Sequence, residues 1–142
     1  MAISKYHSQW AGQFFVATEL TRRGYYVAFP LGNAPRKDVF VVSPTGQEFK
    51  VEVKTLQKPN FWVFSEPKLE ANHFYFFVVL PLQEDKPPIA YILKCDEAHK
   101  LWHEYNTRME STGRTYAPGF WGVNWTTPRQ PQFEDRWGIL PG

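Results

Sequence analysis

The spacing of apolar residues near the start of the chain predicts a helix from Ser8 to Arg23. Ser8 has the short polar side chain that favours a helix N-cap, and Gly24 lies where a left-handed residue often follows a helix. At about 100° per residue, one stripe of this helix carries four mostly apolar side chains. We expect this stripe to pack on the rest of the protein: Trp10, Phe14, Ala17 and Thr21.

Two runs of residues predict the strands of a β-hairpin. The first is β-branched or aromatic, Val39 to Val42, and the second alternates apolar with polar residues, Phe49 to Val53. The intervening Pro44-Thr45-Gly46 suits a three-residue loop with a bulge. If Ser43 faces Gln47, cross-strand partners keep a constant sum of residue numbers. That register places Asp38 opposite Glu52.

Further strands are predicted on both sides of this hairpin. His73 to Leu80 is the most apolar run and reads as a buried central strand. Other extended pieces are predicted at Tyr25–Phe29, Phe61–Phe64 and Ala90–Leu93, with a turn-rich loop at 30–35 and a helical turn or loop at 66–72. Asp96 then caps a second helix that reaches about Met109.

The polar face of the hairpin carries the candidate chemistry. Glu52 and Lys54 are two positions apart and share one face, whereas Phe49, Val51 and Val53 point to the other. Neighbouring carboxylates repel each other unless a cation lies between them, and Mg²⁺ prefers carboxylate and phosphate oxygens. The pattern therefore indicates a metal site for phosphodiester cleavage. The alternative is a solvated strand edge with weak surface ion pairs.

Two other groups of residues leave alternatives open. Glu19 either faces the interior or a cleft, or forms a surface ion pair with Arg22 or Arg23; taken alone, it favours the ion pair. His99 and His103 have the i, i+4 spacing that can ligate zinc, but no third ligand is visible in the sequence. Ordinary packing beside the neighbouring Leu101 and Trp102 is the other interpretation.

Composition narrows the class of protein. The chain has 142 residues, enough for one domain, and its net charge of +2 excludes a basic field over the whole surface. Aromatic residues make up 18%, and Trp121, Trp125 and Trp137 indicate an irregular C-terminal segment from about residue 111, held to the domain by these rings. The single cysteine, Cys95, allows no intramolecular disulfide or zinc ribbon. With no membrane-length run and no signal peptide, the sequence predicts a cytoplasmic protein.

The order of these features resembles the PD-(D/E)XK nuclease superfamily, which has the restriction-endonuclease-like fold. The features are a helix with Glu19, a strand, Asp38 on the next strand, and Glu52-Val53-Lys54 on the third. Within the superfamily they look most like Holliday-junction resolvases and similar small nucleases. The resemblance covers about Gln9 to Leu93. The proline that often precedes the aspartate is Lys37 here.

This resemblance implies specific roles. Asp38, Glu52 and the carbonyl of Val53 would hold Mg²⁺ or Mn²⁺, and Lys54 would position or activate the attacking water. Glu19 would complete the carboxylate set, and Gln57 stands where members often have a polar helper. Four basic residues close in sequence could clamp DNA phosphates, with ordinary surface charge as the alternative: Arg36, Lys37, Lys50 and Lys58.

We therefore expect a single domain over residues 1–142. Its fold would be α/β, with a three-layer restriction-endonuclease-like core in which helices flank a mixed β-sheet. Its function would be that of a Mg-dependent endonuclease acting on DNA, without a membrane partner, and assembly as a homodimer stays open. The alternatives are a catalytically inactive nucleic-acid- or protein-binding module on the same fold, and a hydrolase acting on RNA or nucleotides.

Overall fold

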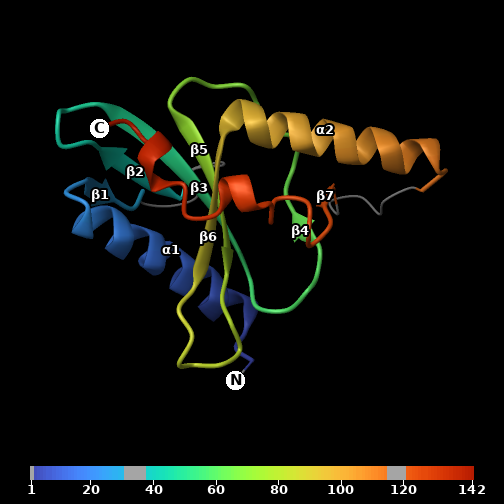
Figure 1. Ribbon diagram of the computed structural model, residues 1–142, viewed down its shortest axis with the longest axis horizontal. Coiled ribbons are helices and arrows are strands. Elements are labelled where there is room, and N and C mark those ends of the chain that lie inside the picture. The colour runs from blue at the N-terminus through green and yellow to red at the C-terminus, as the bar shows by residue number, and fades with distance from the viewer. Residues whose placement is uncertain (1, 31–37, 115–120) are drawn as a thin grey trace.

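The computed structural model describes residues 2–30, 38–114 and 121–142, and it places a five-stranded sheet between two long helices (Figure 1). The helices are α1 (Lys5–Arg22) and α2 (Cys95–Ser111). The strand order is β1-β2-β3-β5-β6, with β3 and β5 parallel and the other pairs antiparallel. The strands are β1 (Tyr26–Ala28), β2 (Val39–Val42), β3 (Glu48–Leu56), β5 (His73–Val79) and β6 (Ile89–Lys94). The predicted α/β class with a mixed sheet flanked by helices is confirmed.

Shorter elements complete the fold. A second, two-stranded sheet pairs β4 (Trp62–Val63) with β7 (Gly122–Val123), and two 3₁₀ turns follow at Pro131–Phe133 and Trp137–Ile139. Within the described ranges, neither helix combines the length and apolar character needed to cross a membrane.

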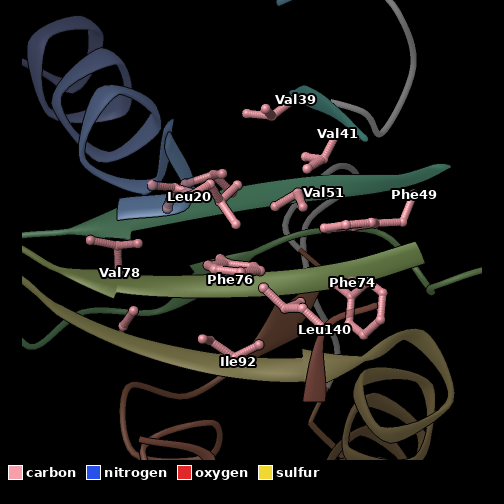
Figure 2. Close-up of a cluster of buried hydrophobic side chains, with 13 residues drawn as sticks. Leu20, Val39, Val41, Phe49, Val51, Phe74, Phe76, Val78, Ile92 and Leu140 are labelled. Atoms are coloured by element: carbon pink, nitrogen blue, oxygen red, sulfur yellow. The ribbon is translucent and has the colours of Figure 1, made fainter. Parts of the chain in front are cut away.

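The two faces of the main sheet bury separate apolar clusters. On one face, Leu20 of α1 packs with side chains such as Val51 and Phe76, as Figure 2 shows. On the other face, Trp102 of α2 packs with Tyr75 and other rings. Strand β5 contributes to both clusters and is buried at every position, which explains why it is the most apolar run in the sequence.

The predicted hairpin register is confirmed from Val39–Val51 to Val42–Glu48. The Ser43 amide donates to the Gln47 carbonyl at 2.8 Å, and Gly46 adopts a positive φ of 94° in the turn. Val39 pairs with Val51, and the Asp38 amide donates to the Val51 carbonyl at 2.9 Å. The ladder ends at this pair, so Asp38 lies one residue beyond it, with its amide bonded to Val51 rather than in a pair with Glu52.

Helix α1 begins earlier than predicted, and its buried face shares only Ala17 with the predicted stripe. Its N-cap is Ser4, not Ser8, and the Ser4 hydroxyl accepts a hydrogen bond from the His7 amide at 3.3 Å. Trp10 and Phe14 are 37% and 53% exposed, so the prediction that they pack across the sheet is wrong. The buried face carries smaller residues, among them Gly12 and Val16, because the helix approaches the sheet too closely for large rings.

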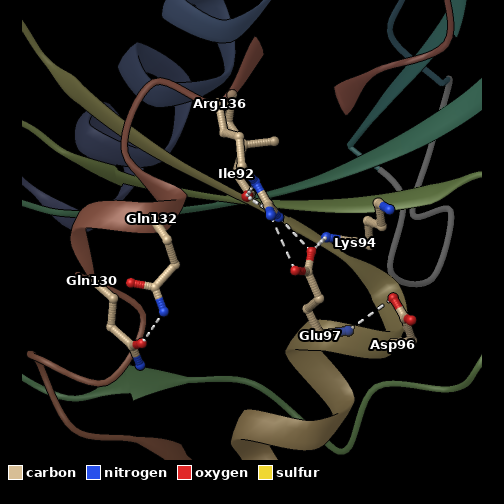
Figure 3. A network of polar contacts seen from close by, with 7 residues as sticks. All are labelled: Ile92, Lys94, Asp96, Glu97, Gln130, Gln132 and Arg136. Carbon is tan, nitrogen blue, oxygen red and sulfur yellow. Dashed lines mark hydrogen bonds and ion pairs between the residues drawn. The ribbon is translucent and has the colours of Figure 1, made fainter. Parts of the chain in front are cut away.

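Helix α2 is capped differently from the prediction. Its N-cap is Lys94 rather than Asp96, and the Lys94 amide donates to Glu97 Oε1 at 2.8 Å. Arg136 from the C-terminal segment donates to Glu97 Oε2 at 3.1 Å and to the Ile92 carbonyl at 3.0 Å (Figure 3). This network determines where the helix starts, because Glu97 supplies the cap that Asp96 was expected to provide.

The C-terminal segment crosses from one face of the sheet to the other. Trp125 stacks on Trp62 at a centroid distance of 5.6 Å in the α2-side cluster. Trp137 lies edge-on to Phe76 at 5.4 Å, and Leu140 is buried with it in the α1-side cluster. Tryptophan rings therefore hold this segment against both layers.

The close approach of α1 to the sheet predicts the outcome of replacing Gly12. A Cβ at this position would overlap the Thr55 side chain. Gly12→Ala should therefore lower the free energy of unfolding by about 1–3 kcal/mol in urea denaturation, as overpacking does. At an exposed helix position the same change would be stabilising by roughly 0.5–1 kcal/mol.

Two variants control this measurement. Gly138→Ala adds a Cβ with no neighbour within 4 Å and should leave stability nearly unchanged. Adding Thr55→Ala to Gly12→Ala should restore part of the loss. A stabilising effect of Gly12→Ala alone would contradict the close approach.

Candidate active site

A hollow of about 540 Å³ lies where the first turn of α1, the end of β3 and the following loop meet. Several predicted site residues line it together: Asp38, Val53, Lys54, Gln57 and Lys58. Asp38 comes from the residue before β2, and the others come from β3 and the residues after it. The antiparallel pairing of β2 and β3 therefore brings residues far apart in sequence to one place.

The Asp38 carboxylate is oriented by the neighbouring strand. Its Oδ2 accepts a hydrogen bond from the Val53 amide at 2.7 Å. The N–H and C=O of one strand residue project toward the same neighbouring strand, so the Val53 carbonyl faces the same side as this carboxylate. Burial raises the pKa of Asp38, although the Val53 hydrogen bond and the Lys54 charge act in the opposite direction.

Glu52 does not line this hollow, but it is the strand neighbour of Val53, which does. It is 5% exposed, and its Oε1 lies 3.4 Å from Lys54 Nζ. Its Oε2 is buried without a hydrogen-bond partner among the described residues. Burial raises the pKa of Glu52, the Lys54 charge and the Tyr75 hydroxyl lower it, and the Asp38 charge raises it further. Glu52 is thus a buried carboxyl whose charge is only partly compensated.

These donors fit a hard divalent cation. Two carboxylates and a backbone carbonyl are oxygen ligands of the kind that Mg²⁺ takes. A buried oxygen without a partner is costly, and a cation would satisfy Glu52 Oε2 and remove the repulsion between the two carboxylates. Asp38, Glu52 and Val53 are therefore the residues that could hold such an ion.

Glu19 does not line the hollow. Instead, its carboxylate pairs with Arg22 at 3.1 Å and with Arg23 at 2.7 Å. The hydrogen bond from Arg23 is the main cause of the lowered pKa of Glu19. The structure therefore shows the surface ion pair that the sequence left open and does not bring Glu19 to Asp38 and Glu52.

The four basic residues predicted near the site have different positions. Lys58 lines the hollow, whereas Lys50 lines a separate one beside β1. Arg36 and Lys37 lie outside the described residues. Gln57 lines the hollow and accepts a hydrogen bond from the Ile3 amide at 3.0 Å, which ties the start of the chain to the site.

Sequence reasoning missed several residues of the site. Lys5, Ser8 and Gln9 line the hollow from the first turns of α1, and Tyr75 is the partner of Glu52 across the parallel β3–β5 pair. A correct start for the helix would have indicated the first three. No local signal in the sequence marks the register between two parallel strands, so Tyr75 could not have been found.

The chain was also compared with known proteins. No protein-family model and no curated protein matches it. Among solved structures, it is similar to a bacterial homing endonuclease, I-Ssp6803I, at 19% sequence identity and a TM-score of 0.48, over 66% of this chain and 71% of that one. A likeness this weak identifies no function.

The burial of Asp38 and Glu52 predicts a stability gain when either charge is removed from the metal-free protein. Because the pKa of each group is raised by folding, the ionised form is unfavourable in the folded state. This penalty is complete above the folded pKa and disappears as the pH falls toward the usual values of 3.8 and 4.5. Asp38→Asn and Glu52→Gln should therefore each raise the free energy of unfolding at neutral pH, by about 1 kcal/mol.

Urea denaturation with a chelator, at pH 7 and at about pH 4, measures both effects. The advantage of Glu52→Gln over the wild type should shrink at the lower pH. Glu104→Gln is the matched control, because Glu104 is an exposed carboxylate on α2 that pairs weakly with Lys100 at 3.9 Å. Destabilisation by Glu52→Gln at neutral pH would mean that other groups already compensate the buried charge.

Proposed function

We propose that this protein is a metal-dependent endonuclease that hydrolyses phosphodiester bonds in DNA through a site of the PD-(D/E)XK kind. One observation carries the proposal: the Asp38 carboxylate accepts a hydrogen bond from the Val53 amide at 2.7 Å, and Lys54 lies 3.4 Å from the buried carboxylate of Glu52, the residue before Val53. This combination of two oxygen donors and an amine is the donor set that metal-assisted phosphoryl chemistry needs. The mixed sheet flanked by helices supports the same assignment.

Each residue would have a separate task. Asp38, Glu52 and the Val53 carbonyl would hold Mg²⁺ or Mn²⁺, because all three supply oxygen ligands on one side of β3. Bound there, the ion would acidify a water molecule and offset the negative charge of the phosphate. The Val53 amide fixes the orientation of Asp38 through its hydrogen bond at 2.7 Å.

Lys54 would act at the reacting phosphate. Its side chain is 29% exposed and reaches between the buried Glu52 and the open hollow. An ammonium group in this position can hold the attacking water and stabilise the negative charge that develops on the phosphate oxygens. Because the Glu52 carboxylate pairs with the Lys54 amine, the Lys54 side chain is oriented before substrate binds.

The walls of the hollow suit the DNA backbone. Lys5 and Lys58 line it together with Lys54, although the whole chain has a net charge of only +2. The first turn of α1 also borders the hollow, and the N-terminal end of a helix favours anions. These groups would clamp phosphates without requiring a basic surface elsewhere.

A second candidate function is a binding module without catalysis. Exposed rings of α1 favour it: Tyr6 is 67% exposed, and Phe14, at 53%, lies edge-on to Phe29. Aromatic side chains of this kind stack on bases or pack on a partner protein. The two candidates differ in whether Asp38, Glu52 and Lys54 are used.

Metal binding tests the first half of the proposal. Calorimetric titration with Mn²⁺ should show saturable binding that Asp38→Ala or Glu52→Ala removes, since each substitution deletes an anionic ligand. Binding should weaken as the pH falls, because the raised pKa values mean that protons compete with the metal for these carboxylates. Unchanged binding in both variants would place the metal elsewhere in the chain.

Cleavage tests the second half. Lys54→Ala should reduce the single-turnover cleavage rate with Mg²⁺ by about 10²–10⁴-fold, because a positioned charge-stabilising group is lost. DNA affinity should change little. The slope of the logarithm of the binding constant against the logarithm of the salt concentration should decrease in magnitude by about one unit. The substrates should include junction, flap, single-stranded and duplex DNA, together with an RNA of matching sequence.

Lys50→Ala is the control for this assay. Lys50 lies on the same strand, four positions and therefore about 13 Å away, and does not line the hollow. Its loss should leave the cleavage rate of bound DNA unchanged. If the wild type cleaves none of the substrates with Mg²⁺ or Mn²⁺ but binds nucleic acid or a protein tightly, the binding module is the correct function.

A further inference from the structure

A second cluster of metal-ligating side chains lies on α2, in the layer on the other side of the sheet from α1. His99 and His103 are one turn apart on this helix, and the structure adds Glu66 from the segment between β4 and β5. The ligand atoms of the three residues all lie within 4.8 Å of one another. The sequence contained the histidine pair but gave no sign of a third ligand, because Glu66 is brought to the helix only by the tertiary fold.

The distances in this cluster are close to those around a zinc ion. Glu66 Oε1 lies 2.8 Å from His103 Nε2 and 3.7 Å from His99 Nε2. Ligand atoms about 2.0–2.1 Å from a tetrahedral ion are roughly 3.3 Å apart. The two distances from Glu66 lie on either side of that value, and the two histidine ligand atoms lie within 4.8 Å of each other, so small side-chain shifts would bring all three atoms onto one ion.

The cluster is not fully explained as an ion pair. The contact between Glu66 and His103 is short enough for a hydrogen bond, whereas the one between Glu66 and His99 is too long for one. The two imidazole rings nevertheless lie next to each other on the helix, with centroids 4.3 Å apart and planes tilted by 46°. A cation would be shared by all three ligand atoms, whereas a proton serves only one pair.

Glu66 is held in place from both sides. The Phe64 carbonyl accepts a hydrogen bond from Trp102 Nε1 at 3.1 Å, and the Lys68 carbonyl accepts one from Cys95 Sγ at 2.8 Å. Both donors belong to α2, and both are buried. The backbone on each side of Glu66 is therefore fixed to the helix that carries the histidines, so the ligand set is already assembled.

We propose that Glu66, His99 and His103 form a Zn²⁺ site with three protein ligands, which clips the segment between β4 and β5 to α2. Two imidazoles and one carboxylate suit zinc better than Mg²⁺, which takes oxygen ligands. All three side chains are partly exposed, so the ion has a direct path from solvent and a position left open for water. This site does not depend on the nuclease assignment.

The test uses the full chain carrying Asp38→Asn, so that zinc bound at the other candidate site does not confuse the result. Calorimetry should show one equivalent of Zn²⁺ bound per chain, and Co²⁺ should give the visible absorption of a four-coordinate ion. His99→Ala, His103→Ala and Glu66→Gln should each weaken Zn²⁺ binding by at least about 100-fold, more than the loss of a supporting hydrogen bond does. Millimolar Mg²⁺ should not compete.

Glu104→Gln is the matched control, since this exposed carboxylate lies on the same helix outside the cluster. It should leave Zn²⁺ affinity unchanged. Circular dichroism of each variant verifies folding, and Glu66→Gln carries the test if a histidine variant does not fold, because Glu66 is the most exposed of the three. No saturable Zn²⁺ binding, or binding that survives all three substitutions, would overturn the proposal.

Discussion

The antiparallel pairing of β2 with β3 is the constraint on which the candidate active site depends. Its register ends at Val39 and Val51, which brings the preceding residue, Asp38, beside the Val53 amide and close enough to Glu52 to affect its pKa. The polar side of β3 also carries Lys54. A slip of one residue would turn Phe49, Val51 and Val53 out of the core and would move the carboxylates to the wrong face. Burial of the apolar side of β3 therefore fixes the geometry of the polar side.

The same burial makes the site unfavourable on its own. Strand β5 is buried along its whole length and pairs with β3, so Glu52 lies next to Tyr75 and away from water. A carboxylate in such surroundings needs a cation, and the single amine of Lys54 at 3.4 Å compensates it only in part. This imbalance is what a divalent ion would relieve, and it links the stability of the metal-free protein to its proposed activity.

Much of the fold could be predicted because it follows from local patterns. Alternation of side chains fixed the faces of β3, and the Pro44-Thr45-Gly46 turn fixed its register. The helix face was predicted wrongly because hydrophobicity favours Trp10 and Phe14, whereas close packing favours Gly12. The contributions of Tyr75 and Glu66 arise only from tertiary contacts between distant segments, which no periodicity in the sequence reports.

Anomalous diffraction from a crystal soaked in Mn²⁺ tests the proposed metal site most directly. The proposed site predicts a peak between Asp38 and Glu52, about 2.0–2.3 Å from an oxygen of each carboxylate and beside the Val53 carbonyl. The Lys54 ammonium should remain next to Glu52. A crystal in which both carboxylates stay without metal, or in which a peak appears only at Glu66, His99 and His103, would contradict the central claim.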